Sequence, residues 1–167
     1  MLALVREVTS AFKISQRFYK LKKKLLKLPH LEYCDRAVTS GKLKKKVTFA
    51  EASKLFTQSL GKLNSKYAEI FASFLERGQI DVYPKTGKEG GAFCAGGLNQ
   101  PTMVLLNHVD TPYNFMTLAH EMGHAFHTEL SRAQRPLYQY YSTAVAEVAS
   151  TLFENFAFDE LFVRGMD

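Results

Sequence analysis

The stretch His120-Glu121-Met122-Gly123-His124 dominates the sequence, and it reads as part of a helix. Two histidines four residues apart lie one turn apart on the same helix face, so both imidazoles can reach one metal ion. Glu121 lies beside them and can take a proton from a water molecule. The pattern therefore predicts a catalytic zinc site. The alternative is a helix that carries two unrelated surface histidines.

A catalytic zinc ion usually has three protein ligands, so a third residue is needed. No further histidine follows at a suitable spacing, but Glu147 and Glu154 lie seven residues apart on one face of a second predicted helix, 144–156. Carboxylates on so apolar a helix are costly unless they meet a cation or a metal. We predict Glu147 as the third ligand and Glu154 as an acceptor for the second N–H of a histidine ring. An amphipathic helix with two solvated glutamates is the alternative. The neighbours expected to be buried are Val145, Val148, Ala149, Leu152 and Phe153.

Three features around the metal ligands complete the predicted site, which holds one zinc ion per chain. Thr111-Pro112 fits an N-cap followed by proline, so the metal helix should begin there and run to about Arg132. Gly123 permits the close approach of another backbone at the level of the zinc. We expect His127 to support the site from outside the ligand set or to pack.

The segments Leu118–His127 and Ala146–Asn155 together resemble the oligoendopeptidase F group, which is related to thimet oligopeptidase. The resemblance extends to Lys13–Lys22, Leu31–Arg36 and the glycine-rich Gly87–Cys94. It implies a mainly α (α+β) fold, a helical metallopeptidase core with a small β-sheet edge next to the zinc-binding helices. It also implies a zinc metalloendopeptidase that hydrolyses short unstructured oligopeptides.

The same resemblance implies that this chain is a partial catalytic domain. It is far shorter than a full member, and it contains no match to the region that contacts substrate and oxyanion after the ligand helix. We divide residues 1–167 into a helical part (1–78), short strands with a glycine-rich substrate loop (79–110), and the zinc-ligand helices (111–167). The alternative function is a truncated, catalytically inactive member that binds only zinc or a peptide.

The helical part shows three amphipathic patterns. The first helix is expected from Leu4 to Leu28, with an apolar stripe that packs; a helix on a membrane surface is the less favoured alternative. Thr48 to Glu51 forms a capping box that begins the second helix, and Gly61 marks its end or a break. The third helix is expected to end at Gly78.

The middle of the chain changes to strand periodicity. Ile80–Tyr83 reads as a short strand and Pro101–His108 as the best strand in the chain. If 101–108 lies at a sheet edge, it could pair with an extended peptide through main-chain hydrogen bonds; the alternative is an ordinary sheet strand. The resemblance favours substrate binding. The predicted substrate contacts are Gly90, Gly91, Ala92, Phe93, Leu106, Asn107 and His108, although His108 also suits a structural role.

Charge and cysteine content limit the possible partners. Residues 1–88 hold 19 Lys and Arg against 7 Asp and Glu, while residues 89–167 hold 3 against 9. A nucleic-acid partner is the rival explanation for the basic half, but no recognition motif accompanies the charge. Two cysteines without a paired spacing favour a reducing compartment, and the lack of a run of about 18 apolar residues argues against a transmembrane helix. We therefore expect a cytoplasmic protein with no nucleic-acid and no membrane partner. The oligomeric state is not indicated.

Overall fold

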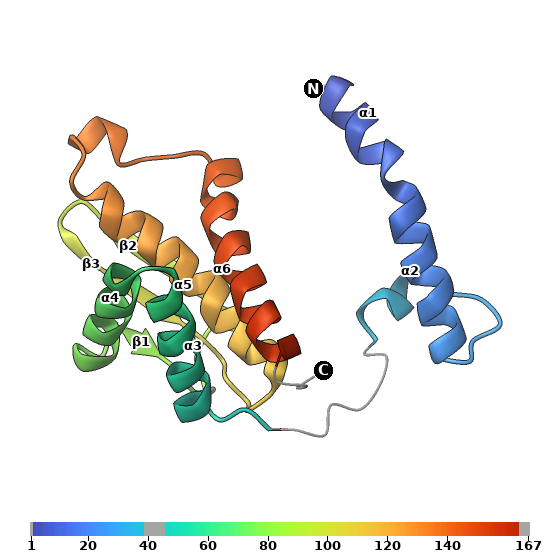
Figure 1. Ribbon diagram of the computed structural model, residues 1–167, viewed down its shortest axis with the longest axis horizontal. Coiled ribbons are helices and arrows are strands. Elements are labelled where there is room, and N and C mark those ends of the chain that lie inside the picture. Colours follow the sequence, from blue (N-terminus) through green and yellow to red (C-terminus); the bar gives the residue numbers. More distant parts are fainter. Residues whose placement is uncertain (1, 39–45, 164–167) are drawn as a thin grey trace. The chain divides into compact units, whose positions relative to one another are not determined.

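The computed structural model describes residues 2–38 and 46–163, and the chain divides into two compact units, Met1–Lys42 and Leu43–Asp167. The described residues are mainly helical, with one small sheet in the second unit (Figure 1). The predicted mainly α (α+β) class is therefore confirmed.

The first unit contains two helices where the sequence predicted one. α1 spans Leu2–Ser10, α2 spans Phe12–Leu25, and a short 3-10 helix follows at Tyr33–Ala37. The hydroxyls of Thr9 and Ser10 hydrogen-bond to carbonyls of the preceding turn, a local alternative that weakens helix continuation at this point.

The apolar stripe of these helices is exposed within the first unit, so its packing against another part of the protein stays a prediction. Phe12 and Phe18 are 51% and 57% exposed. Among the described residues of this unit, Lys22 alone is buried, and its Nζ donates to the carbonyl of Arg36 at 2.6 Å.

The second unit begins with a helical pair, α3 (Phe49–Leu63) and α4 (Ser65–Glu76). The predicted capping box is confirmed, because Thr48 Oγ1 accepts from the Glu51 amide while the Glu51 carboxylate accepts from the Thr48 amide. Gly61 does not end α3, since the helix continues to Leu63. The break comes at Asn64, whose extended backbone ends α3 and whose side chain accepts from the Lys66 amide to begin α4.

A three-stranded sheet follows, with the order β1 (Ile80–Asp81), β3 (Gln100–Leu105), β2 (Phe93–Gly97). β3 is parallel to β1 and antiparallel to β2, so the strand predicted as a possible peptide-binding edge is central and both of its sides are paired. In the part of the chain that the structure describes, β1 and β2 are the edges instead, and β2 is the longer of the two. Sequence periodicity detects strands but cannot rank them across a sheet.

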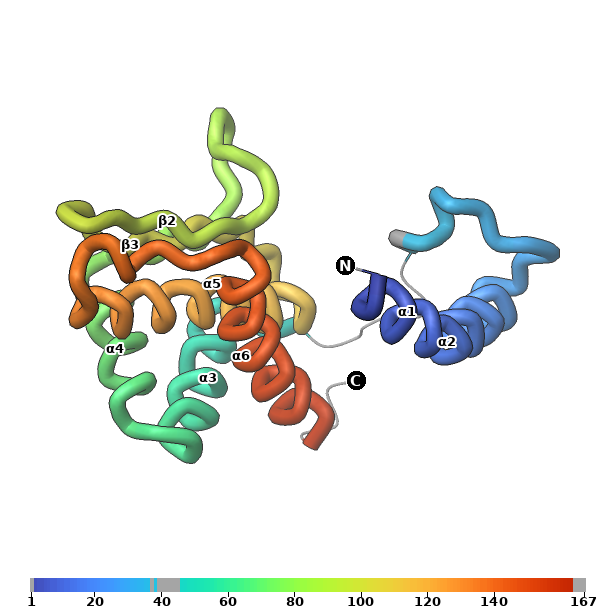
Figure 2. The backbone as a smooth tube through the Cα atoms, turned by 90° about the horizontal axis from the view of Figure 1, so that it is seen from above, coloured from blue at the N-terminus to red at the C-terminus, as the bar shows by residue number. Residues whose placement is uncertain are grey.

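Two long helices complete the second unit, α5 (Pro112–Ser131) and α6 (Thr143–Val163). α5 lies between the sheet on one side and α3 and α4 on the other, and α6 packs along it (Figure 2). Five buried phenylalanines fill the space between α5 and the α3–α4 pair, and they are Phe56, Phe71, Phe74, Phe115 and Phe126.

The apolar residues of α6 are less buried than predicted. Phe153 is buried, but Val145, Val148 and Leu152 are 49%, 66% and 50% exposed. The helix is apolar on most of its circumference, so its pattern did not reveal which side meets α5. None of the helices in the described ranges is both long enough and apolar enough to cross a membrane.

Candidate metal and catalytic site

α5 begins and ends as its sequence predicted. Thr111 caps it by accepting from the Asn114 amide, Pro112 occupies the first turn, and Arg132 is the C-cap. Along this regular helix His120 and His124 lie one turn apart, with ring centroids 5.0 Å from each other. Both side chains are partly exposed, so the pair is accessible to an ion.

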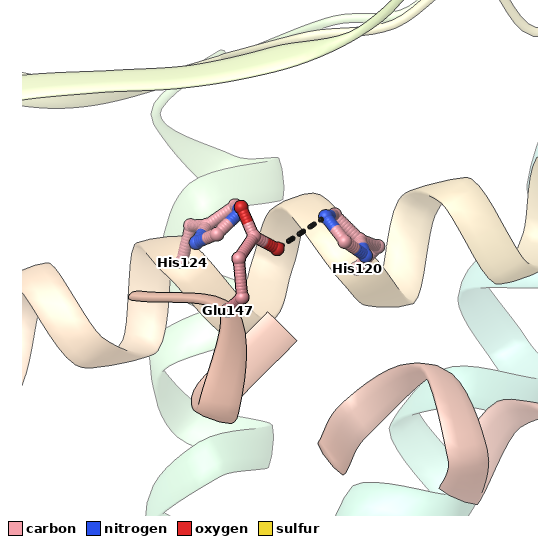
Figure 3. A group of neighbouring side chains, drawn as sticks. All are labelled: His120, His124 and Glu147. Atoms are coloured by element: carbon pink, nitrogen blue, oxygen red, sulfur yellow. Dashed lines mark ion pairs between the residues drawn. The ribbon is translucent and has the colours of Figure 1, made fainter. Parts of the chain in front are cut away.

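Glu147 of α6 reaches this histidine pair. Its carboxylate lies between the two rings, with Oε2 3.4 Å from Nε2 of His120 and Oε1 3.8 Å from Nε2 of His124 (Figure 3). Ser150, one turn further along α6, donates from its Oγ to the same carboxylate at 2.7 Å. This hydrogen bond, followed by the two histidines, holds the pKa of Glu147 below its usual value.

Gly123 explains how α6 comes close enough. A Cβ at this position would lie 2.7 Å from Cα of Ser150 and 2.8 Å from the carbonyl oxygen of Ala149. The predicted close approach of a second backbone is thus confirmed, and α6 is the element that approaches. Any larger residue would push α6, and with it Glu147, away from the histidines.

The three side chains fit a tetrahedral metal ion. Their potential ligand atoms all lie within 4.8 Å of one another. Two ligand bonds of about 2.0–2.1 Å at a tetrahedral angle place their donor atoms about 3.3–3.4 Å apart. Each oxygen of the Glu147 carboxylate lies near one ring at a comparable separation, Oε2 at 3.4 Å from His120 and Oε1 at 3.8 Å from His124. Two imidazoles and one carboxylate also form a donor set that zinc accepts.

Glu121 lies against the edge strand. It is only 7% exposed, and its carboxylate accepts a hydrogen bond from the backbone of Cys94 in β2. Burial raises the pKa of Glu121, and nearby Glu147 raises it further, while His120 opposes both effects. Burial likewise raises the pKa of the Cys94 thiol to about 12, so this cysteine stays protonated at neutral pH.

Glu154 contacts the other nitrogen of a histidine in the group. Its Oε2 lies 3.0 Å from Nδ1 of His120, while Nε2 of the same ring faces Glu147. A carboxylate in this position fixes the ring orientation and favours the tautomer whose Nε2 carries a free lone pair.

His127 lies outside the group. Its ring stacks on Tyr141 with centroids 3.8 Å apart, and the Tyr141 hydroxyl is 3.0 Å from Oγ1 of Thr128. Burial lowers the pKa of His127, which favours the neutral ring. These contacts fasten the segment between α5 and α6 to the metal helix shortly before α6 begins.

The predicted substrate-contact residues divide into two groups. Gly90, Gly91 and Phe93 are exposed, Ala92 is partly buried, and Asn107 donates its side-chain amide to the carbonyls of Glu89 and Gly91 at 2.9 and 2.8 Å. This loop between β1 and β2 projects from the sheet (Figure 2).

Leu106 and His108 instead lie inside the core, 1% and 2% exposed. The His108 Nε2 is 2.9 Å from the carbonyl of Val47, which suits the structural role considered from the sequence. Both side chains are buried in the described fold, and contact of Leu106 and His108 with a peptide stays a prediction. Apolar and polar residues alternate at the end of this strand, and the alternation alone does not show which face is buried.

The sequence did not predict the polar network around Arg132. Arg132 donates to the carbonyls of Gly97 and Gln100 at 3.1 and 2.8 Å and to Oγ1 of Thr102 at 3.0 Å. Its Nε donates to Glu129 at 2.9 Å. The network ties the β2–β3 hairpin to the end of α5. The only sequence signal was an arginine at the helix terminus, which does not specify a partner.

Curated relatives share this sequence over nearly its whole length. The chain is 35% identical over 153 residues to oligopeptidase PepF of Bacillus subtilis (strain 168), an alignment that covers 90% of this chain and 23% of PepF. It is 34% identical over 166 residues to group B oligopeptidase PepB of Streptococcus agalactiae, which covers 98% of this chain and 28% of PepB. The chain thus spans about a quarter of the length of these relatives.

A solved structure and a family model agree with these relatives. The crystal structure of a proposed peptidase from Chlamydophila abortus matches with a TM-score of 0.78 at 29% identity, over 98% of this chain and 28% of that one. The model of peptidase family M3 matches residues 2–166. On this evidence the chain belongs to peptidase family M3.

Proposed function

We propose that the chain supplies the catalytic core of a zinc metalloendopeptidase that hydrolyses short unstructured oligopeptides. The observation that carries the proposal is the convergence of His120, His124 and Glu147 from two helices, with Glu121 on the same helix as the histidines. Peptide hydrolysis is supported by the names of the relatives, which are oligopeptidases.

In this proposal His120, His124 and Glu147 hold one zinc ion, and Glu154 orients the ring of His120 through its Nδ1. A bound zinc ion would polarise the peptide carbonyl and lower the pKa of a water molecule towards about 7. Ser150 keeps the Glu147 carboxylate directed at the histidines through its 2.7 Å hydrogen bond.

Glu121 is the proposed general base. Its carboxylate accepts a proton from the attacking water and later delivers that proton to the leaving amine. Burial raises its pKa towards the operating pH, and a base is most effective when those two values are close. The Cys94 amide holds the carboxylate in place between these two transfers.

The peptide is proposed to lie along the free side of β2. Extended peptides add to exposed sheet edges through main-chain hydrogen bonds, and β2 is the longer of the two edge strands of the described sheet and the one whose Cys94 backbone contacts Glu121. The loop at Gly90 to Phe93 leads directly into this strand, and Asn107 fixes its conformation from β3 through the two carbonyls it binds.

A second candidate is a domain that binds zinc or a peptide without turnover. The chain corresponds to 23–28% of the length of its curated relatives, so groups that assist catalysis there can lie in the remainder. Stabilisation of the oxyanion commonly needs donors in addition to a metal.

The test is cleavage of a quenched fluorescent peptide mixture by the zinc-loaded chain beside its Glu121→Gln variant. We expect both proteins to bind zinc equally, because glutamine changes no proposed ligand. Removal of the base should lower turnover by about 10²–10⁴-fold. Retained hydrolysis in the variant would disprove the role of Glu121. Zinc binding by both proteins with cleavage by neither would favour the binding domain.

A further inference from the structure

A pocket of about 140 Å³ is lined by Thr128, which lies one turn along α5 from His124, and the pocket takes no part in the chemistry proposed above. One wall is Gly96 to Leu98 at the end of β2, and the other is Gln139 to Tyr141 in the segment between α5 and α6. Thr128 and Arg132 of α5 also line it. Figure 2 shows the segment between α5 and α6 running alongside β2. We name this hollow the Tyr140 pocket.

The Tyr140 pocket lies further along the metal helix α5 than the two histidines. His120, His124, Thr128 and Arg132 recur every four residues on α5, so they form one stripe on the helix surface. Each step along this stripe advances about 6 Å. On the strand side, the Cys94 backbone contacts Glu121, and the wall Gly96 to Leu98 follows two to four residues later.

The size of the pocket fits one side chain. Sites for whole small molecules usually occupy about 300–1,000 Å³, which is more than twice the volume available here. An extended peptide beside β2 advances in step with the strand, because paired strands have the same rise per residue. A residue two to four positions from the cleaved bond would therefore reach the pocket.

The lining selects an uncharged side chain. The Arg132 guanidinium already donates to Glu129, Gly97, Gln100 and Thr102, so its charge is paired and most of its N–H donors are used. The remaining surface consists largely of glycine backbone, Leu98 and two tyrosines. Tyr140 is 76% exposed, which leaves its ring free to contact a bound group.

We propose that the Tyr140 pocket is a specificity subsite that accepts a large apolar or aromatic side chain of the bound peptide. The proposal rests on the proposed function, because it requires a peptide to lie along β2. Tyr140 acts as a wall of the subsite and makes no contact with the bond that is cut.

The experiment uses a series of alanine-rich peptides in which a single phenylalanine is moved one position at a time. Affinity is measured by calorimetry with the zinc-loaded Glu121→Gln chain, and cleavage is measured with the unmodified chain. At one position of the peptide, phenylalanine should bind about 10-fold or more tightly than alanine, because it fills one apolar pocket. Tyr140→Ala should remove most of this preference, while Tyr140→Phe should retain it.

Tyr138→Ala is the matched control. Tyr138 is also an exposed tyrosine, at 66%, and it lies two residues from Tyr140 but does not line the pocket. Its removal should leave the preference unchanged. Because both tyrosines are exposed, neither substitution should shift the urea midpoint of unfolding.

The outcomes separate the subsite from the proposed function. Cleavage with no positional preference, or with a preference that Tyr140→Ala leaves intact, overturns the subsite and leaves peptide hydrolysis standing. A preference in binding that Tyr140→Ala removes, without any cleavage, supports the subsite and contradicts hydrolysis by this chain. Failure to bind any peptide of the series overturns the subsite and also contradicts peptide binding along β2.

Discussion

α3 and α4 pack through large aromatic side chains, whereas α5 and α6 meet backbone to backbone. Between the first two helices the rings of Phe56 and Phe71 lie 5.1 Å apart, edge to face. Between the second two, Gly123 leaves no room for a Cβ against Ala149 and Ser150. A pair that only stabilises the fold can be spaced by bulky groups. A pair that must bring a glutamate from one helix to histidines on the other needs a short separation.

The largest expected effect comes from removing an aromatic ring beside the first pair. Phe56 is fully buried and contacts the rings of Phe71, Phe115 and Phe126. Phe56→Ala should lower the free energy of unfolding by about 3–5 kcal/mol, because it leaves a large cavity. Urea denaturation of the metal-free protein measures this loss. A loss below about 1 kcal/mol would show that the core repacks freely.

Because Phe56 belongs to the aromatic packing of the first pair, zinc binding at the second pair should depend little on it. The conservative Phe56→Leu variant, which should stay folded, is expected to bind zinc like the parent chain because Phe56 contacts none of the three grouped residues. Competition with a chromophoric chelator measures the affinity. A tenfold loss of zinc affinity in this variant would mean that the aromatic core also sets the position of His120, His124 and Glu147.

The next effect concerns the second pair. Gly123→Ala places a methyl group within 2.8 Å of backbone atoms, which cannot rotate out of the way. Overpacking of this kind costs about 1–3 kcal/mol. Unlike Phe56→Leu, it should also weaken zinc binding, because α6 carries Glu147 and must move. Stability and zinc affinity are measured as above, and an unchanged affinity would contradict the assigned role of the close contact.

Glu154 tests the site without disturbing the packing. Glu154→Gln keeps the shape of the side chain but removes the charge 3.0 Å from Nδ1 of His120. Loss of such a partner typically lowers metal affinity by about 10–100-fold. Asp159→Asn, an exposed charge removal on the same helix, is the control and should change nothing. Equal zinc affinity for both variants would leave Glu154 as a surface carboxylate.

Local signals in the sequence predicted much of this second unit. Thr48 and Thr111 mark helix starts because capping depends on neighbouring residues, and the helix period alone places His120 and His124 on one face. The predicted grouping with Glu147 in space is observed, because the seven-residue spacing puts Glu147 and Glu154 on one side of α6 and both reach His120.

Features that depend on distant partners were not predictable. The central position of β3 is set by its pairing with segments before and after it, and the burial of Leu106 and His108 follows from that position. The exposure of Val148 and Leu152 depends on which side of α6 faces Gly123. The contacts of Arg132 span more than 30 residues, and no local pattern specifies them.

The same glycine-to-alanine change can be made in the α3–α4 pair, at a position where the backbones do not meet. Gly61 lies within α3, and a Cβ there would meet no atom within 4 Å. Gly61→Ala should raise the free energy of unfolding by about 0.5–1 kcal/mol, since alanine loses less backbone entropy on folding. The same chemical change should thus stabilise one helix pair and destabilise the other. If both substitutions shifted the urea midpoint in the same direction, the close contact at Gly123 would not be what limits the α5–α6 separation.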